Sequence, residues 1–353
     1  MRKKLKKIGL IGRVDPGKTM FDGQTVKTRM MYRLLCESYG KDNVVVVDTY
    51  DYRHRAPAVM ADFARCLAAC DCLIVLLSKN GRRFFFPLLS FSSRHLGKRV
   101  YHNLIGGWLA DNLEKYPRWV KYLNSFEVNW VEAHALVGRL SEKGVHNAEY
   151  LPNFKYFERR DDRDMQPCPH PDGVFHFCTF SRVMEQKGIT DAATAVESLC
   201  SEGHRCRLDV YGPVDERYRG DFESLLKTSP HVEYKGCVAP EESVGVISAY
   251  DALLFPTKWK PEGIPGTIVD ALAAGVPVIA GKWQYHDEML EDGVTGFGYP
   301  LGDCGQLKGA MRRYMALQDN SREEMSRACA RRVGAYSPEA VKAIVCRELS
   351  QWQ

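Results

Sequence analysis

The sequence predicts an α/β protein of two domains, each built on a parallel sheet that is covered by helices. Short apolar runs rich in β-branched residues alternate with amphipathic stretches, as expected when strands and helices alternate. The runs are continuously apolar, which is typical of parallel strands buried on both faces. The chain has 353 residues, more than one hydrophobic core usually supports.

Ten apolar runs are predicted to be strands. They are residues 7–11, 43–47, 72–76, 99–103 and 132–137 in the first half, and 174–180, 207–211, 232–234, 252–255 and 276–280 in the second. Residues 151–154 close the first series, and a charged, proline-bearing stretch follows. We therefore expect an N-terminal domain over 1–158, a linker over 159–173 and a C-terminal domain over 174–337.

The composition is that of an ordinary soluble protein, with 45% hydrophobic and 26% charged residues. No run approaches the roughly 18 apolar residues of a membrane span, and the basic N-terminus leads into too short an apolar stretch for a secretory signal. We expect a cytoplasmic protein. Its 12 cysteines are scattered, which favours reduced thiols over a zinc site. A net charge of +5 favours phosphates or an anionic membrane face, and we expect no nucleic-acid partner.

Residues 12–19 match the pattern of a phosphate-binding loop, with Lys18 and Thr19 at its end. Such a loop must run directly into a helix, whereas Asp22 and Gly23 form a strong turn signal after it. We expect the helix to begin near Thr25. Asp48 and Asp71 are only nominal candidates for holding magnesium. A nucleoside triphosphatase therefore remains the alternative, and a glycine-rich loop that lets two domains approach across a cleft is preferred.

Four segments of the second half carry the more specific signal. They are 180–188 with Arg182 and Lys187, 208–213 with Gly212, 232–238 with Gly236 and Val238, and 261–280 with Glu262, Gly263, Ile264, Pro265, Gly266, Thr267 and Asp270. In this order, they make residues 174–302 resemble the donor domain of glycosyltransferase family 4. These are retaining enzymes of GT-B fold, with two facing Rossmann-like domains and an interdomain cleft.

The resemblance implies a catalytic role for two cations. Arg182 and Lys187 would stabilise the charge that develops on a leaving nucleoside diphosphate. Gly212 would bring the backbone close to the nucleotide, and the segment of Gly236 and Val238 would read the base edge.

The segment 261–280 carries the family's pair of acids, Glu262 and Asp270, with seven residues between them. Gly263 and Gly266 permit a close backbone approach, and a helix beginning near Gly266 would aim its free amides at the diphosphate. The resemblance assigns Glu262 to the transferred sugar and Asp270 to the ribose hydroxyls. The family usually has Glu at the second position, so the shorter Asp270 predicts a looser or water-mediated contact.

The first half is less specific. For the family's sugar-contacting histidine, His102 is the best placed, although His54, His95 and His134 compete and a structural histidine is the alternative. Gly12 and Gly23 match the family's acceptor loop loosely. The resemblance also implies that a last helix, over about 338–353, packs back on the first domain.

The implied reaction is transfer of a sugar from a nucleotide sugar to a hydroxyl of a sugar, glycan or lipid-linked acceptor, in polysaccharide or glycolipid assembly. No metal or other cofactor is expected. The basic N-terminus, together with Arg82 and Arg83 beside three phenylalanines, favours a lipid-linked acceptor and peripheral contact with the inner membrane face. The alternative is a solvated edge beside core aromatics. A non-catalytic nucleotide-sugar binding protein and a sugar-nucleotide epimerase remain open.

Overall fold

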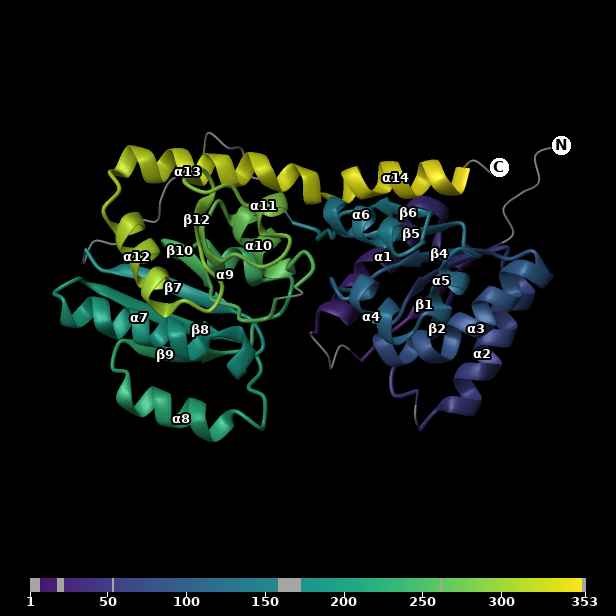
Figure 1. The fold of residues 1–353 in the computed structure, drawn as a ribbon, viewed down its shortest axis with the longest axis horizontal. Helices are drawn as coiled ribbons and strands as arrows, with labels where there is room; N and C mark the ends of the chain where they lie inside the picture. Colours follow the sequence, from purple (N-terminus) through teal and green to yellow (C-terminus); the bar gives the residue numbers. More distant parts are fainter. Residues whose placement is uncertain (1–6, 18–21, 53, 158–172, 261, 351–353) are drawn as a thin grey trace. The chain divides into compact units, whose positions relative to one another are not determined.

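A computed structural model describes residues 7–17, 22–52, 54–157, 173–260 and 262–350 of the chain (Figure 1). The chain divides into two compact units. The N-terminal unit combines Met1–Lys155 with Tyr336–Gln353, and the C-terminal unit is Tyr156–Ala335. Of the linker predicted over 159–173, residues 159–172 lie outside the described residues.

The N-terminal unit is built on a six-stranded parallel sheet in the order β2-β1-β3-β4-β5-β6. Its strands are β1 (Ile8–Gly12), β2 (Val44–Asp48), β3 (Cys72–Leu76), β4 (Arg99–Asn103), β5 (Val128–Val131) and β6 (Ala148–Tyr150). Its helices are α1 (Gly23–Tyr39), α2 (Ala56–Ala69), α3 (Lys79–Leu96), α4 (Leu109–Lys115), α5 (Arg118–Leu123), α6 (His134–Glu142) and α14 (Pro338–Ser350), with a 3₁₀ turn at Lys41–Asn43.

Helices cover both faces of this sheet. Successive residues of a strand point to opposite faces of the sheet, so two neighbouring residues of β4 show which helix covers each face. His102 packs on Phe86 of α3, whereas the Tyr101 hydroxyl lies near Tyr39 of α1. The last helix, α14, packs on α1. α1 and α14 therefore belong to the same core, although they lie far apart in the sequence.

One predicted strand is wrong. Residues 132–137 contain no strand, because the strand ends at Val131 and α6 begins at His134. The strand β5 was missed because Asn129 interrupts its short apolar run. A short apolar run such as Ala133–Val137 fits a helix as well as a strand when only periodicity is used.

The C-terminal unit repeats the architecture with a parallel sheet in the order β12-β11-β10-β7-β8-β9. Its strands are β7 (Phe175–Phe180), β8 (Cys206–Tyr211), β9 (Val232–Gly236), β10 (Ala252–Phe255), β11 (Val278–Gly281) and β12 (Gly296–Tyr299). Its helices are α7 (Ile189–Ser201), α8 (Arg219–Thr228), α9 (Ser243–Ile247), α10 (Gly266–Ala274), α11 (His286–Met289), α12 (Cys304–Met315) and α13 (Asp319–Arg332), with 3₁₀ turns at Glu185–Lys187 and Val333–Tyr336.

In this unit α7 packs with α8 and α12, and α10 packs with α9 and α13. All predicted strands except 132–137 overlap observed ones, so the α/β class with two parallel sheets is confirmed. The strand β12 was not predicted, because Gly296 and Gly298 make its sequence resemble a turn.

Among the described helices, none is both long and apolar enough to cross a membrane.

Candidate active site

The strand order of the C-terminal sheet reverses between β7 and β10. β8 and β9 lie beyond β7 on one side, and β11 and β12 lie beyond β10 on the other. Open parallel sheets bind ligands outside the carboxyl ends of the strands at such a reversal. The segment after β7 carries Arg182 and Lys187, and the segment after β10 carries Glu262. The topology therefore brings the predicted cations and the first acid to one end of the sheet.

The two segments are in direct contact. Gly188, with a φ of +69°, lies so close to Pro256 that a Cβ would collide with the Pro256 carbonyl. The Lys258 amide donates to the carbonyl of Gln186 at 2.8 Å. A positive φ and the close approach both require glycine at position 188.

At this contact the side chains of Lys187 and Glu262 form an ion pair. The hydroxyl of Thr257 also donates to Glu262 Oε1 at 3.2 Å. Both charged side chains keep some exposure, 21% for Lys187 and 14% for Glu262. The pair thus holds a cation and a carboxylate at the carboxyl end of the sheet, where each can still meet a ligand.

Arg182 lies in the same segment, with half of its side chain exposed and Nη1 3.9 Å from Asp215 Oδ2. Gly212 approaches this segment from the end of β8, because with its φ of +128° a Cβ would collide with the Ser181 carbonyl. The Gly212 amide donates to the Gly236 carbonyl at 2.8 Å. Arg182, Gly212 and Gly236 therefore occupy neighbouring strand ends.

Val238 follows β9 by two residues and is half-buried.

α10 begins at Gly266, as predicted. The loop before it is fixed from β11, because the Trp283 indole donates to the Gly263 carbonyl at 3.1 Å. Ile264 is buried, and the Pro265 carbonyl accepts from the amide of Ile268 at 3.1 Å. Within the described residues, the buried hydroxyl of Thr267 has no hydrogen-bond partner. Pro261 lies outside the described residues.

Asp270 lies one turn into α10, as predicted, and its residue is only 4% exposed. The Ser243 hydroxyl, at the start of α9, lies 2.9 Å from Asp270 Oδ2 and 2.8 Å from the Pro240 carbonyl. One hydroxyl proton serves only one of these acceptors at a time. The short side chain is thus held toward α9, and its contact with a ribose stays a prediction.

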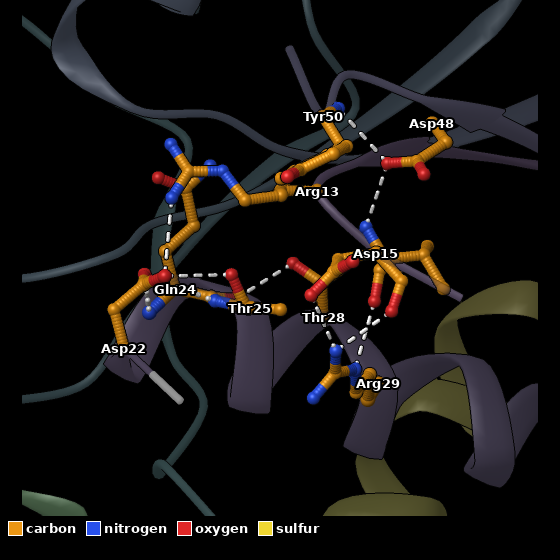
Figure 2. Close-up of polar contacts among 10 residues, drawn as sticks. Arg13, Asp15, Asp22, Gln24, Thr25, Thr28, Arg29, Asp48 and Tyr50 are labelled. Atoms are coloured by element: carbon orange, nitrogen blue, oxygen red, sulfur yellow. Dashed lines mark hydrogen bonds and ion pairs between the residues drawn. The ribbon is translucent and has the colours of Figure 1, made fainter. Parts of the chain in front are cut away.

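In the N-terminal unit, α1 begins at Gly23 rather than near Thr25, because Asp22 caps it (Figure 2). The Asp22 carboxylate accepts from the amides of Gln24 at 3.1 Å and Thr25 at 3.3 Å, and from the Thr25 hydroxyl at 2.8 Å. Arg13 pairs with the same carboxylate at 3.1 Å. A phosphate at this helix end would compete with a built-in anion, which argues against the triphosphatase alternative. Lys18 and Thr19 lie outside the described residues.

The loop after β1 is tied down on both sides (Figure 2). Arg29 of α1 donates to the Val14 carbonyl at 2.8 Å and pairs with Asp15 at 3.0 Å. Asp48 Oδ1 accepts from the amides of Val14 at 2.9 Å and Tyr50 at 3.0 Å. Asp48, nominally a magnesium ligand, therefore fixes the loop.

Gly12 and Gly23, the predicted acceptor loop glycines, bracket this loop. Gly12 ends β1, where a Cβ would lie 2.9 Å from both the Leu76 carbonyl and the Thr28 methyl group. Gly23 is the first residue of α1 and has open space beside it. Close packing thus explains Gly12, and the packing around Gly23 does not require a glycine.

His102 needs correction as a sugar-contacting residue. Its ring has no exposed surface and packs edge-on against Phe86, with centroids 5.1 Å apart. Nδ1 lies 3.2 Å from Asn129 Oδ1, whose amide nitrogen donates to Leu123 and Asn147. Burial, together with the cations Arg82 and Lys27, lowers the pKa of His102 to about 3. A sugar cannot reach this ring in the described arrangement, so we assign His102 to the core.

Sequence reasoning missed three polar partners of the site: Asp215, Ser243 and Thr257. Thr257 stands two residues after β10, so a search for polar residues at strand ends would have found it. Asp215 lies just before a turn and Ser243 just after one, and neither gives a local signal.

Part of the chain is similar to known glycosyltransferases. Residues 161–332 match the family model described as glycosyl transferases group 1. The amylovoran biosynthesis glycosyltransferase AmsK of Erwinia amylovora is 28% identical over 144 residues, which cover 38% of this chain and 34% of AmsK. The alpha-monoglucosyldiacylglycerol synthase of Streptococcus pneumoniae is 25% identical over 158 residues, covering 44% of this chain and 35% of the synthase. The matches thus span about a third of each relative.

The fold has close counterparts among solved structures. Anabaena HepE, solved in complex with UDP, superposes with a TM-score of 0.75 over 98% of this chain and 100% of its own, at 15% identity. This likeness confirms the predicted GT-B fold class. Residues 161–332 therefore carry the glycosyl transferases group 1 domain that the sequence resemblance predicted for the second half of the chain.

Proposed function

We propose that the protein transfers a sugar from a nucleoside diphosphate sugar to a hydroxyl of a glycan or lipid-linked acceptor, with retention of the anomeric configuration. The observation that carries this proposal is the Lys187–Glu262 pair at the strand-order reversal of the C-terminal sheet. An anionic donor there would meet a cation, a carboxylate and the nearby start of α10.

Arg182 and Lys187 act on the diphosphate. As the glycosidic bond breaks, the bond electrons pass to the leaving phosphate oxygen, and fixed cations stabilise the added charge. Lys187 exchanges its carboxylate partner for phosphate oxygens when the donor binds. Glu262, then released, accepts hydrogen bonds from hydroxyls of the transferred sugar. The amides at the start of α10, around Gly266 and Thr267, add positive potential.

The nucleoside binds along the neighbouring strand ends. Gly212 and Gly236 let the backbone approach the nucleotide, and the backbone around Val238 reads the base edge. Asp270 accepts from the ribose hydroxyls, and Ser243 holds its carboxylate in place, supported by their 2.9 Å contact. Because Asp is shorter than Glu, a water molecule bridges part of this contact.

The compared proteins suggest the first substrates to test. HepE has been solved with UDP-glucose, which supports a uridine diphosphate sugar as donor. AmsK is named for amylovoran and the pneumococcal synthase for a glucosyl diacylglycerol, which support a glycan or lipid acceptor. The N-terminal unit, with the loop between Gly12 and Gly23, binds that acceptor. We place the protein in the cytoplasm, in peripheral contact with the inner membrane face.

A thermal-shift panel of UDP-, GDP- and ADP-sugars tests the donor site. A ligand at 100 times its dissociation constant stabilises the folded state by about 2.7 kcal/mol, so the right donor raises the melting temperature. NMR of the product formed with a hydroxyl acceptor then reports its anomeric configuration. Isomerisation of the donor in the absence of any acceptor would indicate an epimerase. Donor binding with neither sugar transfer nor slow donor hydrolysis would indicate a non-catalytic binding protein.

The division of roles between the two acids is tested by Asp270→Asn and Glu262→Gln. We expect Asp270→Asn to weaken donor affinity more, because it removes a ribose acceptor, and Glu262→Gln to lower turnover more. Isothermal titration with the donor and initial-rate kinetics measure both quantities. Equal losses of donor affinity would contradict the assignment.

A further inference from the structure

The outer face of α3 exposes large apolar side chains on a soluble domain. Phe84 is 51% and Phe91 57% exposed, although most large apolar side chains of the described residues are buried. The two lie seven residues apart, which is two helical turns, so they stand on the same side of α3. Pro87, between them, is exposed and Leu88 is half-buried. The His95 ring continues the row, 4.8 Å from that of Phe91.

The charged side chains of α3 and of its neighbour α5 have one sign. α3 contains no acidic residue, and neither does α5, which packs beside it (Figure 1). The exposed cations of the two helices are Lys79, Arg83, Arg94, Arg118 and Lys121. Among the described residues, none of the five forms an ion pair with a carboxylate: Lys79 and Arg83 lie over the Tyr116 ring, and Arg94 donates to the Lys121 carbonyl.

The inward side of α3 is firmly anchored. Phe85, Phe86 and Leu89 are buried in the core of the N-terminal unit, as is the whole side chain of Arg82. The exposed phenylalanines therefore lie on a helix whose other side is well packed, so loose packing of α3 does not explain their exposure. The sequence suggested that both Arg82 and Arg83 could contact a membrane. Arg82 is buried, so only Arg83 is exposed for such a contact.

We propose that the face formed by Phe84, Pro87, Phe91, Arg83 and Arg94 docks on an anionic phospholipid surface. The phenylalanines enter the boundary between headgroups and acyl chains while the flanking cations meet lipid phosphates, as in helices that lie in a membrane interface. Because the flanking cations complement the negative charge of lipid phosphates, an anionic bilayer fits this face better than an apolar protein partner does. The inference names the surface for the membrane contact in the proposed function and does not depend on the donor site.

Vesicle co-sedimentation of the full chain tests this proposal, with phosphatidylglycerol-containing vesicles compared with pure phosphatidylcholine. We expect binding to the anionic vesicles that weakens as salt rises. The double variant Phe84→Ser, Phe91→Ser should lose at least tenfold in partition coefficient. Arg83→Gln with Arg94→Gln should lose affinity for anionic vesicles and much of its salt dependence.

Val294→Ser and Arg219→Gln, two exposed positions of the C-terminal unit, serve as matched controls and should bind vesicles like the parent. The proposal is overturned if the parent ignores anionic vesicles, if the phenylalanine variant binds like the parent, or if light scattering shows a dimer that this variant dissociates. The nucleotide-sugar thermal shift, measured on the same variants, separates failure of docking from failure of the donor site.

Discussion

Arg182 and Lys187 are held differently, although both are assigned to the diphosphate. Lys187 is mostly buried and paired with Glu262, whereas Arg182 is half-exposed and 3.9 Å from Asp215. A paired, partly buried lysine is already oriented, whereas an exposed arginine loses side-chain entropy when it binds. In the proposed mechanism the diphosphate would thus meet one fixed cation, Lys187, and one mobile cation, Arg182.

We expect Arg182→Ala and Lys187→Ala each to lower turnover by about 100-fold, because each removes a positive charge that acts on the leaving group. Steady-state kinetics at saturating donor measures this. Arg219→Ala, which removes an exposed arginine of α8, is the matched control and should leave turnover unchanged. Parental turnover in either site variant would remove that residue from the mechanism.

His102 shows how burial decides the role of a histidine. Its pKa lies at about 3 in the folded protein, below the ordinary value of 6.5, because burial disfavours the charged ring. Asn129 accepts from Nδ1–H, so the neutral tautomer is fixed by the core. The unfolded chain takes up a proton below pH 6.5 and the folded protein does not, so His102 contributes stability above pH 6.5 that is lost as the pH falls toward 3.

We therefore expect His102→Gln to flatten the pH dependence of stability. Between pH 6.5 and pH 5 the parent should lose roughly 1–2 kcal/mol more unfolding free energy than the variant. Urea unfolding at several pH values measures this difference. His54→Gln, at an exposed position, controls for the loss of a histidine, and parallel curves for parent and His102→Gln would contradict the assigned burial.

At the scale of elements, the turn before α7 positions the site. Gly188 ends the 3₁₀ turn Glu185–Lys187 and precedes α7, and it packs against Pro256 beyond β10. One backbone contact therefore sets the separation of the two segments that carry Lys187 and Glu262. A side chain at position 188 would push these segments apart.

Gly188→Ala should destabilise the protein by at least about 2 kcal/mol more than Gly203→Ala. Both glycines have a positive φ, +69° and +90°, so both variants carry the strain of about 1 kcal/mol or more for a left-handed alanine. Only at position 188 does the added Cβ meet backbone. Chemical denaturation measures the difference, and only Gly188→Ala should also lower turnover; equal costs would argue against the contact.

At the scale of the whole molecule, the C-terminal segment of the chain, Tyr336–Gln353, belongs to the N-terminal unit. α14 belongs to the same unit as Met1–Lys155 and buries Val341, Val345 and Leu349. The N-terminal unit is thus discontinuous in sequence, and its core includes the last helix.

Val345→Asp should lower the stability of the N-terminal unit by about 3 kcal/mol or more, because it removes a buried side chain and buries a charge. Ala343→Asp, at an exposed position of the same helix, should cost little. Calorimetry with and without the nucleotide sugar identifies the C-terminal transition as the one the ligand raises. That ligand shift should persist in Val345→Asp, and a loss confined to the C-terminal transition would contradict the placement of α14.

The sequence by itself determined the α/β class, all strands except β5, β6 and β12, and the start of α10. These follow from local patterns, since continuous apolar runs specify buried parallel strands and strand ends converge at one edge of a sheet. Periodicity failed at residues 132–137, where a short apolar run belongs to a helix.

Only the tertiary structure decided which polar side chains meet. Lys187 and its partner Glu262 are 75 residues apart, and Asp270 and Ser243 are 27 apart. The burial of His102 depends likewise on Phe86, contributed by another helix. Local sequence encodes the propensity and periodicity of each element, whereas the environment of a side chain is set by segments that only folding brings beside it.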